Sequence, residues 1–201
     1  MAKVAGMASR LVRGTAIAGG AAAVAGFGIG LAAGEPVDPA DLPVARSLPS
    51  DLCSRLGDVS ILLPKATGEK PKLLQTGRSA VRCTVEADEK TQPTHSSASL
   101  TIAITPYGAK MGGAGAPPIP PETVARQAYD RKPSTELKDR PYPTKIDRSP
   151  VGEGGENWRM SVLVLRADIV VQVEYTAHPI ARETAEKAAL VMADRAIWES
   201  K

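Results

Sequence analysis

The sequence has few aromatic residues, two histidines and two cysteines. Aromatic side chains make up 3% of its 201 residues, and phenylalanine occurs once. A hydrophobic core therefore has to be built mainly from Val, Ile, Leu and Ala, which bury less area per side chain than Phe or Trp.

Most of the chain also lacks an excess of charge of either sign. The formal net charge is +3, and Lys3, Arg10 and Arg13 are the only charged residues before Glu35. Without these three, the 25 basic residues become 22, which equals the number of acidic residues. Because no extended basic surface for phosphates is indicated, we expect no nucleic-acid partner.

Familiar catalytic and metal-binding motifs are absent from the sequence. It contains no G-x-S-x-G nucleophile elbow, no G-x-x-x-x-G-K-[ST] phosphate loop and no H-E-x-x-H zinc motif. The two histidines, His95 and His178, do not form a spaced pair. The sequence therefore predicts a protein that is not an enzyme and that holds no metal or cofactor.

A long uncharged stretch follows the three basic residues near the amino terminus. Residues 14–34 read GTAIAGGAAAVAGFGIGLAAG. This layout is typical of a cleaved signal peptide, and its length also suits a membrane helix, so both interpretations stay open. In either case we expect the larger part of the chain to lie outside the cytoplasm. If residues 14–34 are not cleaved, they would also keep the protein in contact with the membrane.

The composition divides the chain into three parts. Residues 1–34 are predicted to be a signal or membrane-anchor segment, and residues 35–49, which contain four prolines, are predicted to be a linker. Residues 50–201 are long enough for a single domain.

The clearest structural signal lies in residues 158–176, which read WRMSVLVLRADIVVQVEYT. Two runs of alternating apolar and polar residues flank a short Arg-Ala-Asp turn, which is typical of a β-hairpin. On the second arm one face carries Ile169, Val171, Val173 and Tyr175. We expect the amphipathic stretch 180–198 to form a helix that packs on this face, with Ala181, Ala185, Ala188, Met192 and Ala196 along its buried stripe.

The remaining pattern predicts further helices and strands separated by polar loops. Short helices are expected between Ser50 and Gly57 and over 121–132, and strands over 80–86, 99–105 and about 145–148; loops are expected at 87–97 and 107–121. The predicted fold class is α+β, with an antiparallel β-sheet flanked by helices and preceded by an amino-terminal hydrophobic helix.

Cys53 and Cys83 are the only cysteines. Export to an oxidising compartment favours a disulfide between them, which would tie the first helix of the domain to its first clear strand. Two free thiols or a metal pair are the alternatives, although a zinc site needs four ligands and only the two histidines remain.

Several of these features together resemble an actinobacterial family of exported proteins and lipoproteins of unknown function. They are Cys53 in an early helix, Cys83 in a strand, the sequence GEGGENW at residues 152–158, the hydrophobic hairpin and the Ala-rich last helix. The resemblance covers about residues 48–198 and implies a fold similar to PsbP and Mog1. Many family members carry a lipobox cysteine, but no cysteine precedes Cys53 here. This departure from the family implies peptide anchoring or secretion instead of lipid attachment. The resemblance supplies no catalytic residues.

We expect a non-enzymatic extracytoplasmic module that binds an envelope protein, a lipid or a small ligand. One alternative is a secreted hydrolase whose site is assembled from residues scattered in the sequence, namely Glu153, Glu156, Asp168 and His178. Another alternative is a purely structural envelope protein.

Overall fold

The computed structural model describes residues 38–63, 72–91, 94–113, 116–152 and 154–200. Residues 39–201 form one compact unit. The hydrophobic helix predicted at residues 14–34 lies outside the described residues and stays a prediction. Among the helices that are described, none is both long and apolar enough to cross a membrane.

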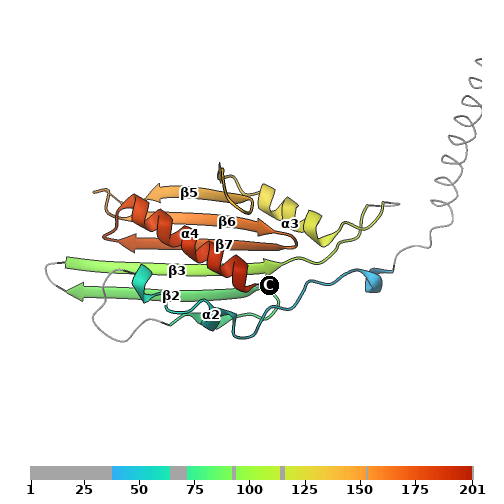
Figure 1. The fold of residues 1–201 in the computed structure, drawn as a ribbon, viewed down its shortest axis with the longest axis horizontal. Helices are drawn as coiled ribbons and strands as arrows, with labels where there is room; N and C mark the ends of the chain where they lie inside the picture. The colour runs from blue at the N-terminus through green and yellow to red at the C-terminus, as the bar shows by residue number, and fades with distance from the viewer. Residues whose placement is uncertain (1–37, 64–71, 92–93, 114–115, 153, 201) are drawn as a thin grey trace, which may run out of the picture. The chain divides into compact units, whose positions relative to one another are not determined.

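Seven strands form one sheet in the order β1-β2-β3-β7-β6-β5-β4, and every neighbouring pair is antiparallel (Figure 1). The α+β class with an antiparallel sheet is therefore confirmed. The strands are β1 (Leu74–Thr76), β2 (Val81–Thr91), β3 (Thr94–Pro106), β4 (Thr135–Leu137), β5 (Thr144–Pro150), β6 (Trp158–Arg166) and β7 (Ile169–His178).

The longest of the described helices, α4 (Arg182–Glu199), crosses one face of the sheet (Figure 1). The short helix α2 (Leu52–Arg55) and the 3-10 turn η2 (Ser60–Leu62) contribute to the same core and lie on this face as well. We call it the helical face. A second 3-10 turn, η1 (Pro39–Asp41), precedes them in the chain.

Strict alternation along the central strands directs their apolar side chains to the helical face. On β7 the predicted alternating residues are buried, and Val171 and Val173 are fully inaccessible. Residues of β3, β6 and β2 join them in one cluster together with α4, including Leu100, Ile102, Ile104, Met160, Val162, Val164, Val81, Cys83 and Val85. The hairpin and its predicted buried face are thus confirmed.

The alanine stripe of α4 packs on this cluster. Four of the five predicted stripe residues are buried, namely Ala185, Ala188, Met192 and Ala196. The fifth, Ala181, is exposed because it is the N-cap residue and precedes the first helical turn. Small side chains on the buried stripe allow the helix to lie close to the strands.

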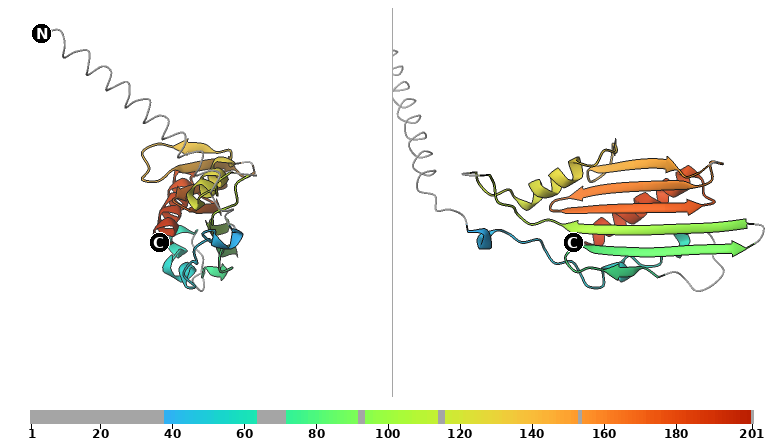
Figure 2. Two further views of the ribbon diagram at one scale, coloured as in Figure 1. Left: turned by 90° about the vertical axis from the view of Figure 1, so that its right-hand side faces the viewer. Right: turned by 180° about the vertical axis from the view of Figure 1, so that it is seen from behind.

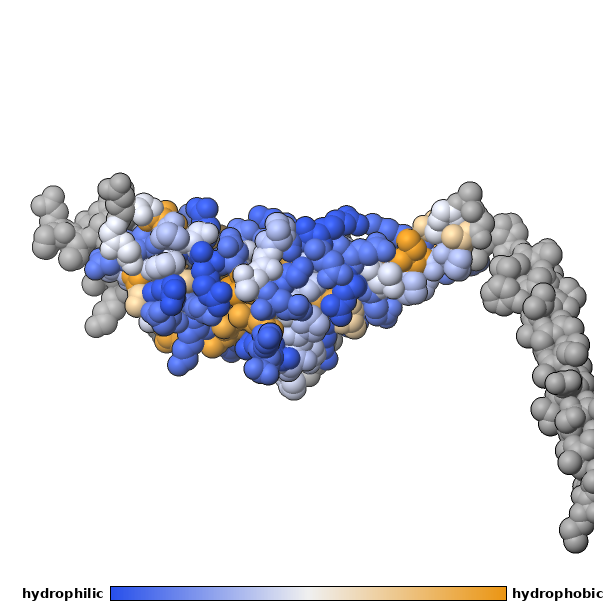
Figure 3. All heavy atoms as spheres, turned by 90° about the horizontal axis from the view of Figure 1, so that it is seen from above, coloured by the Kyte–Doolittle hydropathy of each residue, from blue (hydrophilic) through white to orange (hydrophobic). Residues whose placement is uncertain are grey.

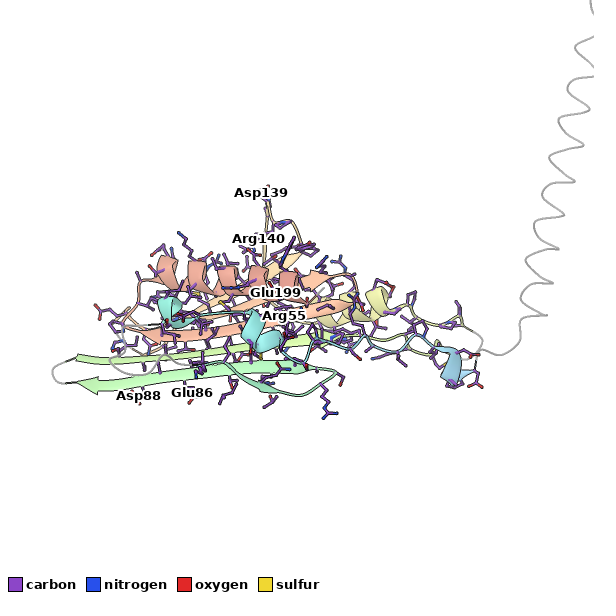
Figure 4. The ribbon with its side chains drawn as sticks, turned by 60° about the horizontal axis from the view of Figure 1, so that its bottom comes forward. Arg55, Glu86, Asp88, Asp139, Arg140 and Glu199 are labelled. Atoms are coloured by element: carbon purple, nitrogen blue, oxygen red, sulfur yellow. A yellow bond between two sulfur atoms is a disulfide. The ribbon has the colours of Figure 1, made fainter. Side chains whose placement is uncertain are left out.

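Of the described helices, α3 (Pro121–Asp130) is the one that covers the other face of the sheet, and it lies at one end of that face (Figure 2). There Ala125 and Tyr129 of α3 pack against Leu163, Leu165 and Val170 in a second, smaller buried cluster. We call the rest of this side the open face. It carries polar side chains from β2, β3 and β7, among them Arg82, Thr84, Glu86, Asp88, Ser99, Thr101, Gln172, Glu174 and Thr176; Figure 4 labels Glu86 and Asp88.

The loop predicted at residues 87–97 is wrong over most of its length. Pairing between β2 and β3 continues from Ala87↔Ala98 to Thr91↔Thr94. Pairing of β3 with β7 begins only at Ser97↔His178, so this part of the hairpin extends past the end of β7. Backbone hydrogen bonds hold two strands together without an apolar face, which explains why hydrophobic alternation does not mark this extension.

The second half of the predicted linker lies against the domain. The backbone N–H of Ala109 donates to the carbonyl of Pro43 at 2.8 Å, and Leu48 is buried in the main core. The guanidinium of Arg46 binds the carboxylate of Asp168 through both of its oxygens. Residues 43–48 therefore follow the surface of the domain, and the boundary at residue 50 stays a prediction.

Cys53 and Cys83 form a disulfide, with their Cα atoms 5.6 Å apart. Cys53 is in α2 and Cys83 is in β2, and both are buried in the main core. The bridge links the short helix to the sheet as predicted.

Candidate functional site

The residues proposed for a hydrolase site do not all lie together. Glu156 is near the His178 end of β7, where its carbonyl accepts a hydrogen bond from the N–H of Ile180, but Asp168 is at the opposite end of that strand. Glu153 lies outside the described residues, and Glu156 is exposed in the connection between β5 and β6. Asp168 is at the β6–β7 turn, where Arg46 holds its carboxylate. His178 is the last residue of β7, at roughly 30 Å from Asp168 for a strand of this length. The described residues also contain no group of three or more His, Cys, Asp and Glu side chains placed to hold a metal ion.

A groove on the helical face is the best candidate for a binding site. It has a volume of about 340 Å³ and lies between η2 and the first half of α4. Seven of its nine described lining residues are apolar: Ile61, Leu62, Leu63, Pro179, Ile180, Ala188 and Val191. Thr184 and Lys187 are the two polar ones. Such a lining is typical of a pocket that binds an apolar ligand and orients it with a few polar groups.

The turn η2 presents Ile61 to solvent because its neighbours are held in place. Val59 is buried, and the carboxylate of Asp58 accepts a hydrogen bond from the N–H of Ser60 at 2.9 Å. The hydroxyl of Tyr175 donates to the carbonyl of Leu62 from the sheet below. With both flanking residues fixed, Ile61 projects outward and is 82% exposed.

The opposite wall of the groove is one stripe of α4. Thr184, Ala188 and Val191 follow the spacing of four and three residues that places helical side chains in one row, and Lys187 lies beside them. Val191 is 46% exposed. The segment before the helix is fixed by the N–H of Ile180, which donates to the carbonyl of Glu156 at 2.8 Å.

Acidic residues of α4 that lie near Lys187 are already engaged in ion pairs. Arg148 donates to both carboxylate oxygens of Glu186, at 2.7 and 2.5 Å, and this hydrogen bonding lowers the pKa of Glu186 below its ordinary value. Arg140, in the loop between β4 and β5, pairs with Asp194, and Figure 4 labels it beside α4. Lys187 forms no ion pair within the described part of the chain. Its charge is therefore available to a ligand in the groove.

Burial in the core raises the pKa of Tyr175 to about 12. Replacing Tyr175 by Phe removes the hydrogen bond to Leu62 and should lower the free energy of unfolding by about 1 kcal/mol. The unfolded tyrosine ionises near pH 10.0, so the wild-type protein should lose stability as the pH rises from there to about 12, and the Phe variant should lack this component of the loss. Urea unfolding of both proteins across this pH range measures the effect.

Burial also raises the pKa of Tyr129 to about 12, but Tyr129 is present in both proteins, so its contribution cancels in the comparison. An identical pH dependence for wild type and Tyr175→Phe would contradict the buried hydrogen bond.

Comparison with protein-family models, curated proteins and solved structures gives no match. The groove therefore has to be interpreted from its residues alone. The groove is not evident from the sequence, because Ile61 belongs to the short apolar run 59–63 and Val191 to a stretch with the pattern of an amphipathic helix. One feature of the sequence indicates that residues 59–63 are not a buried strand. The run contains the polar residue Ser60 and is followed directly by Pro64.

Proposed function

We propose that the protein is a non-enzymatic, extracytoplasmic binding module that holds an acyl chain with an anionic end in the groove between η2 and α4. The exposure of Ile61 and Val191 on the walls of one apolar groove is the observation that carries this proposal. Most large apolar side chains of the domain are buried in its core. Seen from the β5 side, the surface is mostly hydrophilic with a few hydrophobic patches (Figure 3).

The energy for binding comes from covering these side chains. Full burial of one exposed Val or Ile side chain is worth about 1.5–3 kcal/mol. Ile61 is 82% and Val191 is 46% exposed, so a ligand that covers both gains about 2–4 kcal/mol. An ammonium group at the rim attracts an anionic headgroup, and Lys187 is the one charged residue among the described residues of the lining. The groove is thus complementary to a ligand that is apolar along its length and negative at one end.

The polar content of the groove favours an acyl chain over a peptide. A bound peptide brings backbone N–H and C=O groups that need hydrogen-bond partners when they lose water. The described lining offers only Thr184 and Lys187 as polar side chains. An acyl chain carries no such groups along its length and therefore has no unmet hydrogen bonds in this groove.

An extracytoplasmic location is part of the proposal. The disulfide between Cys53 and Cys83 supports it, because such bonds persist in oxidising compartments. The predicted signal or anchor at residues 14–34 and the resemblance to exported actinobacterial proteins with a PsbP/Mog1-like fold point the same way. If residues 14–34 are retained, they would hold the groove close to a membrane that contains acyl lipids.

Replacing Ile61 by Asp tests the groove directly. This change should weaken the binding of a dansyl-labelled fatty acid at least about tenfold, because it removes the apolar contact and places a negative charge beside the anionic ligand. Residues 39–201 are used for the measurement, because the predicted membrane segment would itself bind the probe. Probe fluorescence on titration gives Kd for each variant.

Leu74→Asp is the matched control, since Leu74 is 68% exposed on β1 and does not line the groove. It should leave the Kd unchanged. Lys187→Met should weaken the fatty acid about threefold to tenfold but not the corresponding fatty alcohol, which has no charge. Equal losses for Ile61→Asp and Leu74→Asp, or no binding by the wild type, would refute the proposal.

A further inference from the structure

A polar cavity lies between the β1–β2 turn and the segment that precedes α2. It has a volume of about 680 Å³, which is within the range of small-molecule sites in proteins. Five of its seven described lining residues carry polar side chains, namely Ser47, Ser50, Gln75, Arg78 and Ser79. None of the seven lines the groove between η2 and α4, so this cavity is independent of the proposed function.

Gln75 and the segment before α2 lie on the same side of the sheet. Gln75 is paired with Cys83, whose side chain is in the core of the helical face, and directly paired residues of neighbouring strands point to the same face. The Oε1 atom of Gln75 accepts a hydrogen bond from the N–H of Cys53 in α2 at 3.2 Å, which agrees with this direction. Leu48, in the segment before α2, is buried in the same core.

The β1–β2 turn has a tight conformation that fixes the backbone of Arg78 and Ser79 beside Gln75. Gly77 has a φ of +85°, and a Cβ atom at this position would lie 2.1 Å from the carbonyl oxygen of Ala80. Glycine adopts such a conformation without strain, and it avoids this clash. Because strand pairing resumes directly on both sides of the turn, the third wall of the cavity is held as firmly as the other two.

The polar groups of the cavity are available to a ligand. Within the described part of the chain, Arg78 forms no ion pair, and the three serine hydroxyls form no hydrogen bond with other protein groups. The Gln75 amide uses its oxygen on Cys53, so its two N–H donors are left for a ligand.

The cavity carries one positive charge. Arg78 is the one ionisable residue among the described lining residues, and none of them is acidic. Asp51 follows Ser50 in the chain, but its carboxylate accepts a hydrogen bond from Arg55 at 2.9 Å. The charge of Arg78 therefore favours an anion in the cavity.

We propose that this cavity binds a small hydroxylated anion of the sugar-acid type. A guanidinium binds a carboxylate through two parallel N–H···O bonds. Serine hydroxyls can donate or accept and the Gln75 amide can donate, so together they suit sugar hydroxyls, which do both. Leu48 adds apolar surface for the C–H groups of a sugar ring. A ligand that is both charged and hydroxylated uses all of these groups at once.

Nuclear magnetic resonance of the isotope-labelled full-length protein, titrated with glucuronate, tests the site. We expect saturable shifts at Gly77, Arg78 and Ser79 and at residues 47–50. Glucose lacks the carboxylate and acetate lacks the hydroxyls, so each should bind at least about tenfold more weakly than glucuronate because it loses several hydrogen bonds. No saturable shifts with glucuronate, or equal affinities for glucuronate and acetate, would overturn the proposal.

Arg78→Gln should weaken glucuronate binding about tenfold, because it removes the charge that holds the carboxylate. The affinity for glucose should change by less than about twofold, since glucose carries no charge. Arg78 is exposed, so its replacement should leave the fold intact.

Arg82→Gln is the matched control, because it makes the same change of charge on the open face and Arg82 does not line the cavity. It should bind glucuronate like the wild type. An equal loss in Arg78→Gln and Arg82→Gln would mean that overall charge attracts the anion, and it would contradict a site in this cavity.

Discussion

Replacing Cys53 and Cys83 together by Ala is expected to lower the free energy of unfolding by about 3.5 kcal/mol. The two residues are 30 positions apart, and cross-linking them restricts the unfolded chain far more than the folded one. In the folded protein the bridge joins α2 to β2 inside the main core. Urea unfolding followed by tryptophan fluorescence measures the change.

Chemical reduction of the wild type provides the control for the alanine substitutions. Reduction breaks the disulfide but keeps both sulfur atoms in the core. The free energy of unfolding of the reduced protein should therefore fall by an amount similar to that of the alanine variant. Each single replacement should cost about as much as the double one, because either breaks the bridge. A reduced wild type whose free thiols have been verified and whose stability is unchanged would contradict the structural role of the disulfide.

Replacing Ile102 by Ala should lower the free energy of unfolding by about 3–4 kcal/mol, within the range for emptying a fully buried Ile site. Ile102 lies on β3, near the middle of the sheet, with its side chain in the core on the helical face. Its strand partners Cys83 and Val173 are also fully buried, so the cavity cannot easily close. Urea unfolding gives the difference.

The preceding residue of the same strand is the matched control. Thr101 points to the open face and is only partly buried. Thr101→Ala should change the stability by less than about 0.5 kcal/mol, as is usual for surface substitutions. Similar losses for the two variants would mean that both faces of the sheet are covered, which contradicts the one-sided core.

Elements with a strong local pattern were predictable from the sequence. The alternation of Val171, Val173 and Tyr175 gave the hairpin and its buried face, because one side of β7 meets α4 and the other does not. The two cysteines gave the disulfide once an oxidising compartment was assumed. In these cases local pattern and tertiary structure agree.

Elements that depend on long-range pairing were not predictable. The strands β1 and β4 have three residues each, too few to show a period, and they form because a longer neighbour offers them hydrogen bonds. The polar extension of β2 and β3 was mistaken for a loop for the same reason. No property of the segment alone marks it as paired.

The candidate groove depends on which apolar residues stay exposed, and this is a property of the assembled fold. Ile61 and Val59 are alike in the sequence, but one is 82% exposed and the other 1%. The difference arises because η2 is fixed by the Tyr175 hydroxyl, which comes from a strand more than a hundred residues later. Sequence patterns alone cannot assign such an exposure.

The central claim is that the groove between η2 and α4 holds an acyl chain. The most direct measurement is a titration of the isotope-labelled domain with a fatty acid, followed by nuclear magnetic resonance. We predict that the largest shifts occur at Ile61, Pro179, Ile180 and the first half of α4, with little change on the open face. No saturable shifts, or shifts centred on the open face, would contradict the claim.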